Sequence, residues 1–120
     1  MRLRAARGAI RVGSDDTEAL LGATERLLWS MLERNAIQAE DLVSVLFTAT
    51  EDLRSAFPAE AARRMGLGRI PLLCAQEIPV AGSMPSVVRV LLHFHSERSL
   101  DEVVHVYLDG AESLRDDVPE

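Results

Sequence analysis

Two charged residues interrupt apolar segments and are the first candidates for chemistry. Glu77 lies within "RIPLLCAQEIPV" (Arg69–Val80), and Arg89 lies within "SVVRVLLHFH" (Ser86–His95). A charge in such surroundings costs several kcal/mol of desolvation unless a partner meets it. Glu77 can therefore point to solvent at a strand end or lie in a pocket against an arginine. Arg89 can extend its guanidinium past its neighbours to water, or it can lie on the floor of a sheet as a binding site for an anion.

A third candidate, Arg7, lies between the small residues Ala6 and Gly8, which leave space for a ligand. An edge-strand charge that deters aggregation explains Arg7 equally well. All 13 basic residues are arginine, so Schiff-base chemistry and a P-loop lysine are excluded. Arginine offers a planar fork that binds carboxylates through two hydrogen bonds.

Other reactive side chains form no recognisable catalytic group. His93, His95 and Glu97 could bind a metal, but two histidines near a strand end without a clear third ligand favour no metal site. Cys74 has no evident histidine or lysine partner that would activate its thiol. The sequence has no glycine-rich phosphate loop and no nucleophile elbow. These residues suit the binding of a small polyanion, and no cofactor is expected.

Composition limits the class of protein. The chain has 120 residues, which predicts a single domain over 1–120, and its 48% hydrophobic and 27% charged residues indicate a globular protein. No apolar run reaches the roughly 18 residues that a membrane span needs. A net charge of −6 argues against nucleic-acid binding, and the single cysteine favours a cytoplasmic location.

Periodicity predicts an α+β domain in which one long amphipathic helix covers a mostly β sheet. We expect the acid-free start of the chain to form a strand rather than a targeting segment. The expected elements are a strand over 3–12, a helix over 15–35, a strand over 41–50 covered on both faces, a short helix from Pro58, strands over 69–80 and 86–95, a helical turn between Ser99 and Glu102, and a hairpin through Asp109-Gly110.

The long helix is expected to begin at Asp15, which has capping-box spacing to Glu18. Its apolar stripe consists of Leu20, Leu21, Thr24, Leu27, Leu28, Met31 and Leu32. One helix of this size cannot cover a whole sheet with its edges, so we expect the uncovered parts to pair with other subunits in a homo-oligomer.

Five stretches, in order and at similar spacing, resemble the trimeric class of chorismate mutase. They are "RGAIRV", "TATEDLRSAFPAEAAR", "PLLCAQE", "VVRVLL" and "HVYL" followed closely by "LR". The resemblance implies a homotrimeric pseudo-α/β barrel with active sites between subunits. It also implies the rearrangement of chorismate to prephenate, in the pathway to the aromatic amino acids.

The resemblance assigns roles by position. Arg89 corresponds to the catalytic arginine, Arg7 to an arginine that binds a substrate carboxylate, and Glu77 to a residue near the ring hydroxyl. The other implied substrate contacts are Phe57, Ala59, Arg63, Leu73, Cys74, Tyr107, Leu114 and Arg115.

The sequence departs from this family at three positions. Glu60 replaces a lysine found in some members, Leu73 replaces a threonine, and Asp116 lies where proline is common. Cys74 and Glu77 would point to opposite faces of a regular strand. We therefore expect a bulge or a turn near Gln76 that brings both to one pocket.

Two other functions fit an arginine-lined pocket. One is a small trimeric imine or enamine deaminase, which also binds carboxylates through an interfacial arginine. The other is a non-catalytic trimer that binds a small effector. Loss of chorismate in the presence of the pure protein distinguishes these functions from a mutase.

Overall fold

The computed structural model describes residues 1–117 of the chain and side chains up to Arg115. The side chain of Asp116 therefore lies outside the described part. The elements are β1 (Arg2–Arg11), α1 (Thr17–Arg34), η1 (Ala39–Asp41), β2 (Leu42–Ala49), α2 (Ala59–Arg64), β3 (Leu72–Gln76), β4 (Val87–Ser96), η2 (Leu100–Glu102), β5 (Val106–Leu108) and η3 (Ala111–Asp117), where η marks a 3₁₀-helix.

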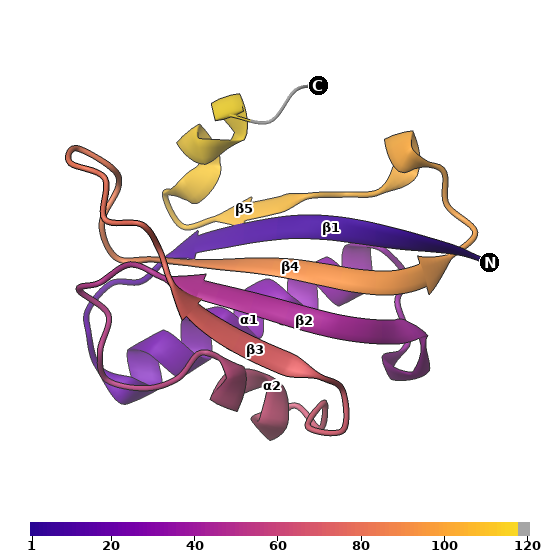
Figure 1. Ribbon diagram of the computed structural model, residues 1–120, viewed down its shortest axis with the longest axis horizontal. Helices are drawn as coiled ribbons and strands as arrows, with labels where there is room; N and C mark the ends of the chain where they lie inside the picture. Colours follow the sequence, from indigo (N-terminus) through magenta and orange to yellow (C-terminus); the bar gives the residue numbers. More distant parts are fainter. Residues whose placement is uncertain (118–120) are drawn as a thin grey trace.

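Within the described residues, the strands form one mixed sheet of five in the order β3-β2-β4-β1-β5. β4 lies at the centre and pairs antiparallel with β1 and β2, whereas β3 and β5 are parallel edge strands. Helices α1 and α2 both lie behind the sheet in the view of Figure 1. The α+β prediction is confirmed. The sheet face opposite the helices is called the open face below.

Helix α1 lies within the predicted range, and all seven residues of its predicted stripe are buried. Its predicted first residue is wrong. Asp16 is the N-cap, and its carboxylate accepts a hydrogen bond from the Ala19 N–H at 3.1 Å. The Asp15 carboxylate accepts instead from the N–H groups of Arg54 and Ser55, each at 2.9 Å. Asp15 therefore stabilises a distant loop and is not available to cap the helix.

The helices of this chain cover only one face of strand β2, so the second predicted cover does not come from the same chain. Val45 and Phe47 are buried against the helices, with 1% and 0% of their surface exposed. The alternating residues Leu46 and Thr48 are partly exposed on the open face. The apolar run in the sequence therefore reflects one protein core and one apolar surface without a partner in this chain.

The predicted hairpin through Asp109-Gly110 is wrong as well. β5 runs parallel to β1, and the chain then enters η3. Asp109 and Gly110 do have the positive φ angles of a tight turn, 53° and 96°. However, Glu112 accepts a hydrogen bond from the Gly110 N–H at 2.7 Å, and Ala111 is fully buried. These contacts turn the chain onto the open face instead of back along β5.

Among the residues that the structure describes, none of the helices has the length and apolar character that a membrane crossing would require.

Gly8 permits the close approach of α1 to β1. A Cβ atom at Gly8 would lie 2.4 Å from Met31 Sδ and 3.1 Å from Leu27 Cδ1, and both of these side chains are fully buried. We expect Gly8→Ala to lower the free energy of unfolding by about 1–3 kcal/mol through overpacking. Urea denaturation at fixed protein concentration measures this. Met31→Ala should be less destabilising in the Gly8→Ala background than alone, and simple additivity would contradict the clash.

Candidate active site

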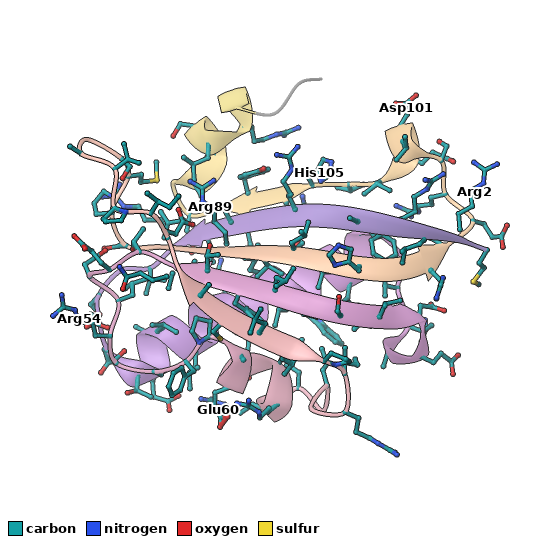
Figure 2. All side chains as sticks on the ribbon, viewed as in Figure 1. Arg2, Arg54, Glu60, Arg89, Asp101 and His105 are labelled. Atoms are coloured by element: carbon teal, nitrogen blue, oxygen red, sulfur yellow. The ribbon has the colours of Figure 1, made fainter. Side chains whose placement is uncertain are left out.

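A pocket of about 350 Å³ lies on the open face, over β1, β4 and β2. Four of the residues assigned by resemblance line it together: Arg7, Arg89, Tyr107 and Leu114. Figure 2 shows Arg89 and His105 over the part of the sheet formed by β4, β1 and β5. The pocket therefore brings two arginines and a tyrosine to one apolar hollow.

The alternation of β4 places Arg89 in this pocket. Val88 and Val90 point into the core, with 0% and 3% of their surface exposed, so Arg89 must point to the open face. Its neighbours across the sheet are Ala9 on β1 and Thr48 on β2. The small side chain of Ala9 leaves room beside the guanidinium, and the pairing of Arg7 with Leu91 places both arginines on the same face.

Glu77 faces Arg89, so the solvent-facing alternative for Glu77 is wrong. Glu77 Oε2 lies 2.7 Å from Arg89 Nε, and only 18% of the Glu77 side chain is exposed. The Nε atom is buried without an aligned hydrogen bond, so the contact is an ion pair rather than a hydrogen bond. The Thr48 hydroxyl donates to the same carboxylate oxygen at 2.7 Å. Together they fix the carboxylate against the guanidinium.

Cys74 lies on the other face of the sheet, and the predicted bulge near Gln76 does not form. β3 keeps a continuous register with β2, in which Cys74 pairs with Phe47 and Gln76 with Ala49. Cys74 therefore packs against the helix-side core, whereas Glu77 turns to the open face. A separate hollow of about 700 Å³ is lined by both Cys74 and Phe57.

The remaining residues assigned by resemblance also lie outside the pocket that contains Arg89. Ala59 is buried in the core, and Leu73 and Phe57 have 60% and 75% of their surface exposed. Arg63 forms an ion pair with Glu60 at 2.8 Å on α2, which Figure 2 shows on the other side of the view from His105. Arg115 is exposed on η3. One chain thus provides two separate sets of candidate residues.

Sequence reasoning missed Thr48, which lines the pocket, and His105, which contacts the backbone of Arg7. Thr48 could have been found because it alternates with the buried Phe47. His105 precedes β5, and its Nδ1 accepts a hydrogen bond from the Arg7 N–H at 3.0 Å. Burial lowers the pKa of His105 below its ordinary value, and the positive charges of Arg7 and Arg115 lower it further.

The two histidines considered as metal ligands have other surroundings. His93 Nδ1 lies 3.2 Å from the Ser44 hydroxyl on the open face, and His95 is exposed. Over the described residues, no three side chains of histidine, cysteine, aspartate or glutamate gather into a possible metal site.

A clamp at the start of β4 positions the strand that carries Arg89. Ser86 has a positive φ of 60°, which is strained for a residue other than glycine. The Asp52 carboxylate accepts from the Ser86 N–H at 3.3 Å and from its hydroxyl at 2.8 Å. Burial disfavours the charged carboxylate, but hydrogen bonds from Thr50 and Ser86 outweigh it and lower the pKa of Asp52.

The fold is an α+β domain, and its open sheet face carries a pocket lined by two arginines. A family model described as chorismate mutase type I matches residues 3–118. The chain is 54% identical to Chorismate mutase AroH of Thermus thermophilus over 117 residues, which cover 97% of this chain and 96% of that protein. It is 37% identical to Chorismate mutase AroH of Bacillus subtilis, over 98% and 94% of the two chains.

The solved structures agree. The chorismate mutase from Clostridium thermocellum superimposes with a TM-score of 0.90 at 39% identity, covering 92% of this chain and 98% of that one. The chain belongs to the chorismate mutase type I family.

The Asp52–Ser86 clamp predicts a pH-dependent contribution to stability. Because the pKa of Asp52 is lowered on folding, its contribution is present at neutral pH and is lost as the pH falls below about 4. We expect Asp52→Ala to cost about 1 kcal/mol at pH 7, since solvent weakens hydrogen bonds to an exposed carboxylate. Urea denaturation of wild type and Asp52→Ala at pH 7 and at pH 3.5 measures the destabilisation at each pH. If the free energies of unfolding of wild type and Asp52→Ala differ by the same amount at both pH values, the pH-dependent role of Asp52 is contradicted.

Proposed function

We propose that the protein is a chorismate mutase, an isomerase that converts chorismate to prephenate in a homotrimer with sites between subunits. The observation that carries the proposal is the placement of Arg89, which Glu77 holds on the open face beside Arg7. Family membership supplies the reaction. The match also argues against the deaminase alternative. Turnover of chorismate by the pure protein would exclude a binder without catalysis.

The reaction is a concerted [3,3] rearrangement in which an ether C–O bond breaks as a C–C bond forms. It moves no proton and needs no covalent intermediate, which suits a site with neither a nucleophile nor a general base. Binding the flexible dianion in its reactive diaxial form turns binding energy into orientation, which can be worth several kcal/mol. The apolar wall formed by Leu46, Leu91 and Leu114 suits a carbocyclic ring.

Arg89 supplies the electrostatic part of the mechanism. Negative charge grows on the ether oxygen as the C–O bond lengthens, and a guanidinium held nearby stabilises it. Glu77 and Thr48 anchor the Nε side of Arg89, while 41% of the Arg89 side chain is exposed toward the pocket. A donor oriented in advance in this way is typically worth roughly 10²–10³ in rate.

Arg7 and Tyr107 are assigned to the substrate carboxylates. Both line the pocket, from neighbouring strands β1 and β5. The chain has a net charge of −6, which repels an anionic substrate, so a local arginine cluster has to reverse the potential at the site. Arg115, near the C-terminal end of the described chain, is assigned to the entrance.

The homotrimer accounts for the two separate sets of residues. Cys74 and Phe57 lie away from the Arg89 pocket in one chain, but a neighbouring chain can place its own copies over it. Phe57 and Leu73 are exposed apolar side chains, which are expected at a subunit interface. The Glu60–Arg63 ion pair would lie at the pocket mouth and weaken the attraction of Arg63 for the substrate. We also infer a cytoplasmic location, which suits the free thiol of Cys74.

Removal of Arg89 tests the proposed mechanism. If Arg89 meets charge that develops mainly in the transition state, its loss should lower kcat far more than it weakens binding. We expect Arg89→Ala to lose at least roughly 10²-fold in kcat, measured by the ultraviolet absorbance of chorismate. Arg89→Lys should recover only part of the loss, because an ammonium group cannot reproduce the guanidinium fork.

Oligomer mass and melting temperature control for misfolding of the Arg89 variants, since Glu77 is left without its partner. An Arg89→Ala protein that keeps the wild-type mass and changes only KM would show that Arg89 is a binding residue. A wild-type protein that leaves chorismate unchanged would contradict the proposed function itself.

A further inference from the structure

The edge of the sheet at β5 contains a hydrogen bond that backbone pairing does not explain. β5 pairs with β1 over three positions, from Gly8 with Val106 to Ile10 with Leu108. One residue earlier in each segment of the chain, the backbone N–H of Arg7 donates a hydrogen bond to Nδ1 of the His105 side chain at 3.0 Å. An imidazole thus extends the ladder to the residue that carries a pocket guanidinium.

We propose that His105, neutral and with its proton on Nε2, is a positioning residue that holds the backbone of Arg7 so that its guanidinium binds a substrate carboxylate. This inference rests on the proposed function, because it gives Arg7 a carboxylate to bind. The geometry requires this tautomer, since Nδ1 can accept the Arg7 N–H only when it carries no proton. His105 does not line the pocket, so it acts through Arg7.

The charges around His105 favour the neutral form. Arg7 on β1 and Arg115 on η3 both act on His105 electrostatically, and Tyr107 follows two residues later on β5. Burial and then the two arginines lower the pKa of His105 below its ordinary value near 6.5. Protonation would add a third positive charge and would turn Nδ1 into a donor facing another donor.

This arrangement has a specific kinetic consequence. As the pH falls through the lowered pKa of His105, the hydrogen bond to Arg7 is lost and Arg7 is no longer held in place. The carboxylate that Arg7 binds is charged in the ground state and in the transition state alike. Loss of the contact therefore raises KM and leaves kcat unchanged. Above that pKa, KM does not depend on this group.

The experiment compares kcat and KM for chorismate between pH 4.5 and 8 in wild type, His105→Asn, His105→Ala and His95→Asn. Asparagine places an oxygen acceptor near the position of Nδ1 but does not titrate. The wild-type KM should rise about three- to tenfold at acid pH, the effect typical of one lost hydrogen bond. His105→Asn should keep a low KM throughout, and His105→Ala a high KM throughout. His95 is exposed on β4, so His95→Asn should behave as wild type.

A second measurement does not depend on turnover. Two-bond ¹H–¹⁵N correlation spectra of the imidazoles should show His105 with its proton on Nε2 and a titration midpoint below 6.5. The chemical shift of the Arg7 backbone amide should change with the same midpoint. A proton on Nδ1, or an acid rise in KM that persists in His105→Asn, overturns the inference. If the spectra agree but chorismate is not converted, the proposed function fails and the His105–Arg7 contact stands.

Discussion

The ion pair between Glu77 and Arg89 is the interaction on which the candidate site depends. A partly buried carboxylate on the edge of the sheet needs a cation or a hydrogen-bond donor to offset its desolvation, and Arg89 provides a cation from the central strand at 2.7 Å. The contact spans β2, since Glu77 follows β3 and Arg89 belongs to β4. It fixes one side of the guanidinium and leaves the rest exposed. An arginine held in this way needs little reorganisation when charge develops beside it, which is the condition for electrostatic catalysis.

The rest of the fold presents this pair on a surface. Both helices lie behind the sheet (Figure 1), so the core takes one set of alternating residues and the open face keeps the other. Gly8 lets α1 approach closely, and Asp52 fixes the start of β4. The same alternation separates Cys74 from Glu77. A pocket that uses both residues therefore needs a second copy of the chain, which is the physical reason for the proposed oligomer.

Much of this arrangement could be predicted because it follows from local rules. Period-two alternation placed Arg89 opposite Val88 and Val90, and period 3.6 identified the buried face of α1. The predictions were wrong where contacts between residues far apart in the sequence determine the local structure. Asp15 was expected to cap α1, but its carboxylate meets a loop about 40 residues away. The turn at Asp109-Gly110 has hairpin geometry, yet the burial of Ala111 redirects the chain into η3. The expected bulge near Gln76 assumed that a single chain builds the whole pocket.

We propose that each site combines the Arg89 pocket of one chain with the Phe57 and Cys74 hollow of another. Mixed oligomers test this most directly. Arg89→Ala and Phe57→Asp, each nearly inactive alone, are unfolded together, refolded as hybrids and assayed with chorismate. Phe57 is exposed in the chain, so aspartate is expected to permit folding while repelling the dianion. If the sites lie between chains, about a quarter of them in a 1:1 hybrid combine two intact halves, and activity recovers to that level. Hybrids of the correct mass that show only the residual activity of the two parents would contradict the account.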